Sequence, residues 1–229
     1  MDASRYPRPE QLPRAPRTLR LAVLISGGGT TMANLADRIA AGRLDARVEI
    51  VVSSRAGVPG IERATERGIE AVVLARKAYL KADGGFDCDA FTAALLDLLD
   101  PRGIDLVVLA GFMSRLAPAI FDRHAVVNVH PALLPRYGGA GMFGHHVHEA
   151  VLAAGDRESG CSVHFVDPEY DHGPIIAQRS VPVLDGDTPE TLAERVQQAE
   201  RELYPEVIGW IAAGRVRVES DKVVIAEAP

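Results

Sequence analysis

Apolar residues along most of the chain alternate between short continuous runs and stretches in which they recur every three or four positions. Five runs have the length of strands: residues 19–26, 48–53, 71–74, 104–109 and 125–129. Three stretches with helical spacing lie between them: residues 31–41, 59–67 and 86–99. Continuous apolar runs are typical of strands covered on both faces. This alternation predicts an α/β fold, a doubly wound, mostly parallel sheet of Rossmann-like type.

The pattern changes after residue 155. Cys161, Val163 and Phe165 alternate with Ser162, His164 and Val166, and residues 175–183 form another extended stretch. We expect both to extend the sheet as an antiparallel C-terminal extension. Residues 188–213 have the spacing of a long amphipathic helix that ends at Gly214. Residues 216–218 and 222–225 then predict a closing hairpin around Ser220 and Asp221.

The first 18 residues differ from the rest in composition. Prolines at positions 7, 9, 13 and 16 exclude a helix, and the segment has little apolar surface to bury. We therefore expect residues 1–18 to form a flexible or loosely attached N-terminal tail. Residues 19–229 show no internal repeat and no linker, so we expect them to form one domain.

Composition narrows the functional classes. The chain has 229 residues, 47% of them hydrophobic, and a net charge of −6, which argues against general nucleic-acid binding. Only Cys88 and Cys161 are present, so a disulfide framework is not expected. No apolar run is long enough to cross a bilayer, and the N-terminus lacks the apolar centre of a signal peptide. These features favour a cytoplasmic protein that binds no membrane.

The strongest chemical signal is the sequence Asn-Val-His-Pro-Ala-Leu-Leu-Pro, which begins at Asn128. Asn128 and His130 are two residues apart at the end of an apolar run, so on a strand both side chains point to the same face. Asp171 follows downstream in Asp-His-Gly-Pro. An amide, an imidazole and a carboxylate can together stabilise an oxyanion and move a proton. A carboxylate beside His130 would favour the protonated imidazole.

A glycine-rich turn connects the first predicted strand to the first predicted helix. It reads Ser-Gly-Gly-Gly-Thr-Thr and ends at Thr31. Backbone N–H groups in such a turn, together with the helix N-terminus, bind anions. The spacing is neither Gly-x-Gly-x-x-Gly nor that of a nucleoside-triphosphate loop. We therefore favour a phosphomonoester site over a tight turn with a purely structural role.

Two further segments carry candidate site residues. The stretch Leu-Ala-Gly-Phe-Met leaves a buried strand where open α/β sheets bind ligands, and Phe112 and Met113 suit the wall of a slot for a flat ring. Three histidines, His145, His146 and His148, invite a zinc hypothesis. Their spacing on a helix and the lack of partner cysteines argue against it, so no metal is expected. A substrate contact and a solvent-exposed helix start both remain open for these histidines.

These motifs occur in the order seen in one family. The chain resembles the phosphoribosylglycinamide formyltransferases, folate-dependent enzymes, over about residues 19–213. Besides the segments above, the resemblance includes Ser-Val-His-Phe-Val and Glu-Arg-Glu-Leu-Tyr-Pro. Two departures stand out: Thr30 and Thr31 replace the usual Ser-Asn, and Ser114 precedes Arg115 where the family often has arginine at once.

The resemblance implies transfer of a formyl group from 10-formyltetrahydrofolate to the amine of glycinamide ribonucleotide, in purine biosynthesis. It implies the catalytic residues Asn128, His130 and Asp171. The implied ribonucleotide-binding residues are Gly28, Gly29, Thr30, Thr31, His148 and Glu200. The implied folate-binding residues are Phe112, Met113, Ser114, Arg115, Val166 and Asp167. Both substrates are small molecules, and the sequence leaves a monomer and a homodimer equally open.

Three alternatives compete with this interpretation. A hydrolase that releases formate from 10-formyltetrahydrofolate would use the same scaffold, with an N-terminal regulatory domain that 18 residues cannot provide. Formylation of initiator tRNA predicts an additional C-terminal domain and a basic surface, and the chain is acidic. A non-catalytic nucleotide-binding or metal-sensing module would have the histidine cluster at its centre, and its binding would survive loss of His130.

Overall fold

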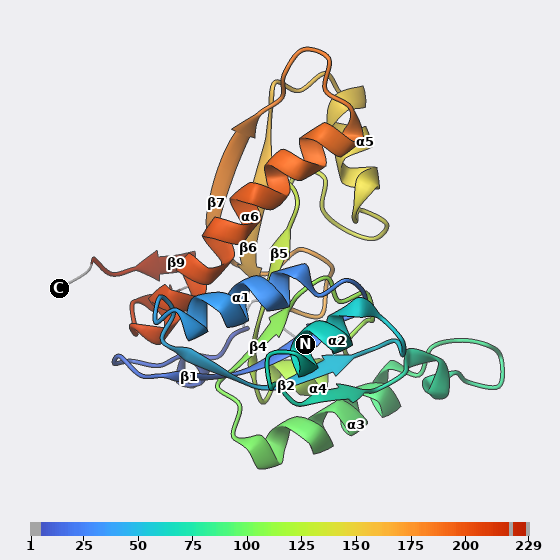
Figure 1. The fold of residues 1–229 in the computed structure, drawn as a ribbon, viewed down its shortest axis with the longest axis vertical. Coiled ribbons are helices and arrows are strands. Elements are labelled where there is room, and N and C mark those ends of the chain that lie inside the picture. The colour runs from blue at the N-terminus through green and yellow to red at the C-terminus, as the bar shows by residue number, and fades with distance from the viewer. Residues whose placement is uncertain (1–5, 220–221, 228–229) are drawn as a thin grey trace.

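A seven-stranded sheet, in the order β3-β2-β1-β4-β5-β6-β7, forms the centre of the computed structural model, which describes residues 6–219 and 222–227 (Figure 1). The strands are β1 Leu19–Ile25, β2 Ala46–Ser53, β3 Ala71–Val73, β4 Leu106–Leu109, β5 Ala125–His130, β6 Glu158–Phe165 and β7 Ile175–Pro182. The first five pair in parallel, and β6 and β7 are antiparallel. The predicted fold class is therefore confirmed.

The described residues form six α-helices around this sheet. They are α1 Thr30–Ala40, α2 Pro59–Thr65, α3 Cys88–Leu99, α4 Pro118–Phe121, α5 His145–Ala153 and α6 Pro189–Ala212. The sequence pattern predicts α1, α2, α3 and α6. It misses α4, because four residues are too few to show a period. It leaves α5 undecided, because polar histidines occupy its first turn and only Val147, His148 and Val151 are buried.

Two hydrophobic cores explain the continuous apolar runs. Leu21, Val23 and Ile25 of β1 pack into the core shared with α1 and α6. Ala22 and Leu24 pack into the other core, with α3 and α4. Figure 1 shows α1 and α3 on opposite sides of the sheet. Both faces of β1 are thus removed from water, as the run predicts.

Helix α6 contains Pro205 in its interior. Proline has no N–H, so the carbonyl of Arg201, four residues earlier, has no partner within the helix. That carbonyl instead accepts hydrogen bonds from α1, from Asn34 Nδ2 at 2.8 Å and Arg38 Nη2 at 3.1 Å. The proline therefore creates the acceptor that fastens α6 to α1.

The residue before this proline, Tyr204, fastens α6 to the sheet. Its side chain is fully buried, and its hydroxyl lies 3.0 Å from the carbonyl oxygen of Leu109 and 2.9 Å from that of Val127. Burial raises the pKa of this phenol, so it stays protonated and donates. Tyr204 thereby holds the ends of β4 and β5 beside each other.

The N-terminal segment differs from the expected loose tail. Of residues 6–18, Tyr6 and Leu12 are buried, and the Tyr6 hydroxyl donates to Asp122 at 2.8 Å. Tyr6 also packs against Phe121, because an aromatic ring among prolines still has apolar area to bury. Residues 6–18 thus lie against the domain. The earlier part of the predicted tail, residues 1–5, lies outside the described residues, and the domain boundary at residue 18 stays a prediction.

A second, two-stranded sheet follows α6. Strands β8 Val216–Glu219 and β9 Lys222–Ile225 pair in antiparallel register. The predicted hairpin is confirmed, while the turn expected at Ser220 and Asp221 lies outside the described residues.

Candidate active site

A cavity of about 540 Å³ opens at the carboxyl ends of the central strands. Parallel strands that end at one edge of a sheet bring their following loops together there, which is why open α/β sheets bind ligands at this edge. Of the predicted site residues, these line the cavity: Thr30, Thr31, Phe112, Met113, Ser114, Arg115, Asn128, His130, His148, Val166, Asp167, Asp171 and Glu200. Only Gly28 and Gly29, of all those predicted, are not part of its wall.

Asn128 lies opposite His164 across the β5–β6 pair. Asn128 Nδ2 and His164 Nε2 are 3.2 Å apart, and His164 Nδ1 is 2.8 Å from the carbonyl oxygen of Phe165. A carbonyl can only accept, so Nδ1 carries the proton. Burial lowers the pKa of His164, so its ring is neutral and Nε2 accepts from the amide. His164 therefore fixes which way Asn128 presents its amide.

His164 is the site residue that the sequence interpretation misses. The strand alternation places Cys161, Val163 and Phe165 in the core, and His164 falls on the opposite face. Its position in Ser-Val-His-Phe-Val is visible in the sequence, but its role depends on pairing with a strand 36 residues away. Only the antiparallel register reveals that role.

His130 is buried between two hydrogen-bond acceptors. Its Nε2 donates to the carbonyl oxygen of Tyr137 at 2.7 Å, and its Nδ1 is 3.5 Å from Asp171 Oδ2. Each ring nitrogen therefore has an oxygen nearby, a carbonyl at Nε2 and a carboxylate at Nδ1. At 3.5 Å the approach to Asp171 is long for a hydrogen bond, which leaves Nδ1 available to another partner.

Asp171 lies beside both histidines. Its Oδ2 also accepts from the backbone N–H of Gly139 at 3.0 Å, and its Oδ1 is 3.7 Å from His164 Nε2. The residue has a left-handed backbone, with φ of 53°. A non-glycine residue held in this conformation is often part of a functional site. The structure thus brings Asp171, from a distant part of the sequence, to the cavity that Asn128 and His130 line.

Helix α1 begins at one side of the cavity. Gly29 has φ of 69°, and a Cβ at this position would lie 2.5 Å from Gly60 Cα. Glycine is therefore required for the turn that places Thr30 and Thr31 at the helix start. Gly28 does not line the cavity, and its carbonyl accepts from the Arg63 guanidinium. The exposed N–H groups and hydroxyls of this helix start suit an anion.

Two titratable side chains line the cavity from the neighbouring helices α5 and α6. Burial raises the pKa of Glu200 to about 7, so its carboxyl is partly protonated at neutral pH. His148 is 3% exposed, and its Nδ1 has no hydrogen-bond partner among the described residues. Burial lowers the pKa of His148, which favours its neutral ring. Both groups are therefore ready to exchange hydrogen bonds with a polar ligand.

The predicted ring slot has a mixed wall. Phe112 is half-buried and Met113 is 55% exposed, so apolar surface faces the cavity. Ser114 is buried and its Oγ has no partner among the described residues, whereas Arg115 is exposed. Asp167 uses its carboxylate to hold its own loop, accepting from Glu169 N at 2.8 Å and pairing with His172 at 3.1 Å. That hydrogen bond raises the pKa of His172.

His145, His146 and His148 are not arranged around a common metal site. His145 and His146 are exposed and approach surface carboxylates, Glu190 at 3.9 Å and Glu149 at 3.4 Å. Within residues 6–219 and 222–227, no group of three His, Cys, Asp or Glu side chains is arranged to hold a metal ion. None of the helices in this part of the chain is long and apolar enough to span a membrane.

Comparison with known proteins decides the family. Residues 19–208 match the formyl transferase family. The chain belongs to this family. It is 38% identical over 205 residues to the phosphoribosylglycinamide formyltransferase of Escherichia coli strain K12, covering 89% of this chain and 92% of that protein. The chloroplastic enzyme of the same name from Arabidopsis thaliana is 37% identical, covering 93% and 72%.

Solved structures agree with this formyltransferase assignment. Glycinamide ribonucleotide transformylase 1 from Symbiobacterium toebii superposes with a TM-score of 0.81 at 38% identity, covering 92% of this chain and 95% of that one. The phosphoribosylglycinamide formyltransferase of Coxiella burnetii gives 0.82 at 36% identity, covering 91% and 94%. The resemblance read from the sequence is therefore confirmed.

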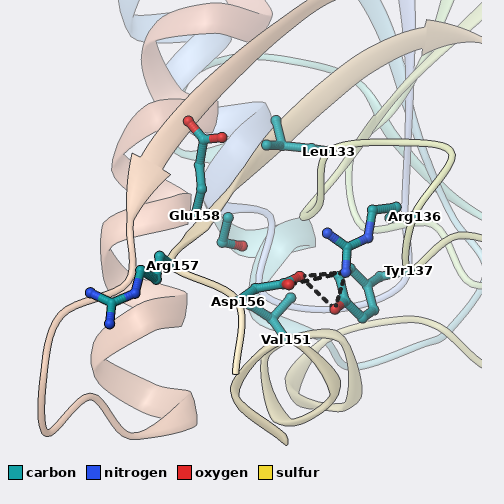
Figure 2. A pocket seen from close by; sticks show the side chains of 8 residues that line it. Leu133, Arg136, Tyr137, Val151, Asp156, Arg157 and Glu158 are labelled. Atoms are coloured by element: carbon teal, nitrogen blue, oxygen red, sulfur yellow. Dashed lines mark hydrogen bonds and ion pairs between the residues drawn. The ribbon is translucent and has the colours of Figure 1, made fainter. Parts of the chain in front are cut away.

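This formyltransferase has a second, smaller cavity of about 250 Å³. Arg136, Tyr137 and Asp156 form a hydrogen-bonded group at its wall (Figure 2). None of its lining residues also lines the larger cavity. Tyr137 nevertheless contacts a residue of the larger cavity, because its carbonyl accepts a hydrogen bond from His130.

Proposed function

We propose that this formyltransferase transfers the formyl group of 10-formyltetrahydrofolate to the amine of glycinamide ribonucleotide, in de novo purine biosynthesis. The observation that carries the proposal is the convergence of Asn128, His130 and Asp171 on one cavity that the start of α1 also lines. An oxyanion-stabilising set beside an anion-binding helix start suits acyl transfer to a phosphorylated amine. The similar proteins are named phosphoribosylglycinamide formyltransferase and glycinamide ribonucleotide transformylase, and these names support the same reaction.

The reaction proceeds by direct attack. The amine nitrogen of the ribonucleotide bonds to the formyl carbon, and the carbonyl oxygen becomes an oxyanion. Asn128 donates from its amide, one hydrogen of which His164 already orients, and the His130 imidazolium donates from Nδ1. Asp171 balances the charge of His130 and passes a proton from the attacking amine toward the folate nitrogen. The oxyanion then collapses to a carbonyl, and the bond between the formyl carbon and the folate nitrogen breaks, so the protonated folate nitrogen leaves. No covalent bond to the enzyme is formed.

The remaining lining residues bind the two substrates. Thr30, Thr31 and the glycine turn before them receive the phosphate, with the helix N-terminus behind it. Glu200 accepts from ribose hydroxyls, and His148 supplies a further polar contact. Phe112, Met113 and Val166 provide the apolar wall for the folate ring, with Ser114, Arg115 and Asp167 at its polar side.

The direct test is an assay of formyl transfer with both substrates. Asn128→Ala, His130→Ala and Asp171→Asn each remove transition-state stabilisation, so kcat/KM should fall by at least about 100-fold. His146→Ala changes an exposed histidine of the same type and serves as the matched control. Turnover of His130→Ala close to that of the unmodified protein would contradict the proposed mechanism.

The hydrolase alternative is separated by the same assay. A hydrolase releases formate from 10-formyltetrahydrofolate when no ribonucleotide is present, whereas a transferase requires the amine. We expect formate release to stay below about 1% of the transfer rate, since water is not held as the phosphorylated amine is. Formate release at the transfer rate would favour the hydrolase.

Two finer statements belong to this proposal. We place the enzyme in the cytoplasm, on the composition and cysteine content of the chain. The two small-molecule substrates are its proposed partners, and a homodimer is the oligomer to test. Sedimentation velocity over a range of protein concentrations distinguishes the monomer from the dimer.

A further inference from the structure

The loop from residue 131 to 139 supplies a backbone partner to each of two proposed catalytic residues. The Tyr137 carbonyl accepts from His130 Nε2 at 2.7 Å, and the Gly139 N–H donates to Asp171 Oδ2 at 3.0 Å. These two groups are only two residues apart in the loop. The loop conformation therefore sets how His130 and Asp171 stand relative to each other.

Tyr137 holds this loop in an unfavourable backbone conformation. Its φ is 56°, in the left-handed region that residues with a Cβ rarely adopt. Such a residue returns to an extended or right-handed conformation unless its surroundings hold it. A rotation of this backbone would turn the Tyr137 carbonyl away from His130.

The side chain of Tyr137 is fastened on the side away from the active site. Its hydroxyl donates to Asp156 Oδ2 at 2.6 Å, and Arg136 Nη2 lies 3.0 Å from Asp156 Oδ1 and 3.1 Å from the Tyr137 hydroxyl (Figure 2). The Arg136 guanidinium also lies 5.1 Å from the centre of the tyrosine ring. The hydrogen bond raises the pKa of Tyr137 and lowers that of Asp156, as expected for a phenol that donates to a carboxylate.

Asp156 has a fixed position because it follows the end of α5. Gly155, with φ of 68°, turns the chain out of the helix, and the Asp156 N–H approaches the Val151 carbonyl at 3.4 Å. The carboxylate lines the smaller cavity and does not line the larger one. Tyr137, which donates to this carboxylate and accepts from His130, therefore links Asp156 to the active site.

We propose that Asp156 is a positioning residue for the formyl transfer. Through its hydrogen bond to Tyr137 it holds the loop in the conformation that presents one acceptor to His130 and one donor to Asp171. Arg136 keeps the Asp156 carboxylate aimed at the phenol. This role rests on the proposed function for its kinetic consequence, but its structural consequence at His130 does not.

The kinetic test uses Tyr137→Phe and Asp156→Asn, each of which removes the fastening with little change in volume. We expect kcat to fall about 10-fold while KM for either substrate changes less than about 2-fold, because a misplaced catalytic group slows chemistry without weakening binding. Glu158→Gln is the matched control. It makes the same kind of change in the same cavity, and Figure 2 shows its carboxylate away from the Arg136 group.

A spectroscopic measurement tests the proposal independently of activity. In protein with ¹⁵N-labelled histidine, the Nε2 proton held by the Tyr137 carbonyl should exchange slowly with water and be observable, and His130→Ala assigns it. We expect the signal to broaden or vanish in Tyr137→Phe and Asp156→Asn and to persist in Glu158→Gln. If the unmodified protein transfers no formyl group, the proposed function fails while this signal still tests the fastening.

The inference would be overturned by an unchanged kcat in both variants with the His130 signal intact. If the melting temperature of these variants also falls, Asp156 contributes to stability alone.

Discussion

The two ends of the active-site cavity are built in different ways. At the β5–β6 end, Asn128, His130 and Asp171 are each held by at least one hydrogen bond from the protein. At the α1–α6 end, Glu200 has a pKa raised by burial, and on α5, which packs against α6, His148 Nδ1 has no partner among the described residues. The first end is organised before a ligand arrives, as transition-state stabilisation requires. The second end has unmet hydrogen-bonding capacity that a ligand can satisfy.

The comparison predicts that changes at the β5–β6 end reduce kcat. His164→Phe fills the same buried space but removes the acceptor that orients the Asn128 amide. We expect kcat to fall about 10–100-fold with little change in either KM, since the loss is felt in the transition state. Steady-state kinetics with both substrates measure it. A change in KM with constant kcat would place His164 at the binding end instead.

At the α1–α6 end we expect changes in KM and in its dependence on pH. The pKa of Glu200 in the empty site is raised to about 7, and ribose hydroxyls that donate to its carboxylate would lower the pKa in the complex. Binding then releases a proton and is tighter at high pH. From pH 8 to pH 6, KM for the ribonucleotide should rise by up to about 10-fold.

Glu200→Gln is the control for this pH dependence. It shares the titrations of the substrate but has no ionisable carboxyl, so only the difference between the two proteins reports on Glu200. We expect a higher KM with a flatter pH profile. Parallel profiles in the two proteins would show that Glu200 does not titrate on binding.

The smallest effect is expected at the start of α1. Thr31→Val keeps the shape of the side chain and removes one hydroxyl donor, while the backbone N–H groups remain. KM for the ribonucleotide should rise about 3–10-fold at constant kcat, the cost of one hydrogen bond to a charged group. Thr65→Val, an exposed threonine on α2, is the matched control. Equal effects of the two changes would remove Thr31 from the phosphate site.

Much of this contrast could be predicted from the sequence. Strands with apolar runs identify the sheet, and its parallel order brings the ends of β1, β4 and β5 to one edge. Asn128 and His130 are recognisable because strand periodicity places them on one face. The glycine run before Thr30 is visible in the sequence, and the structure gives its reason at Gly29, where the chain adopts φ of 69°.

What the sequence did not show depends on contacts between distant segments. His145, His146 and His148 are neighbours in sequence, yet His145 and His146 are exposed and approach surface carboxylates, whereas only His148 is buried. His164 stands alone in sequence and becomes important through its cross-strand pairing with Asn128. Likewise, the burial of Tyr6 depends on Phe121, more than a hundred residues away, and no local pattern encodes it.

Pro205 has a consequence for which ligands the site can accept. By freeing the Arg201 carbonyl for Asn34 and Arg38, it joins the helix that carries Thr30 and Thr31 to the helix that carries Glu200. The anion-binding and hydroxyl-binding groups are therefore held at a fixed distance from each other. The site selects ligands by the distance between their charged group and their hydroxyl groups, because a longer or shorter spacer would require the two helices to move apart or together.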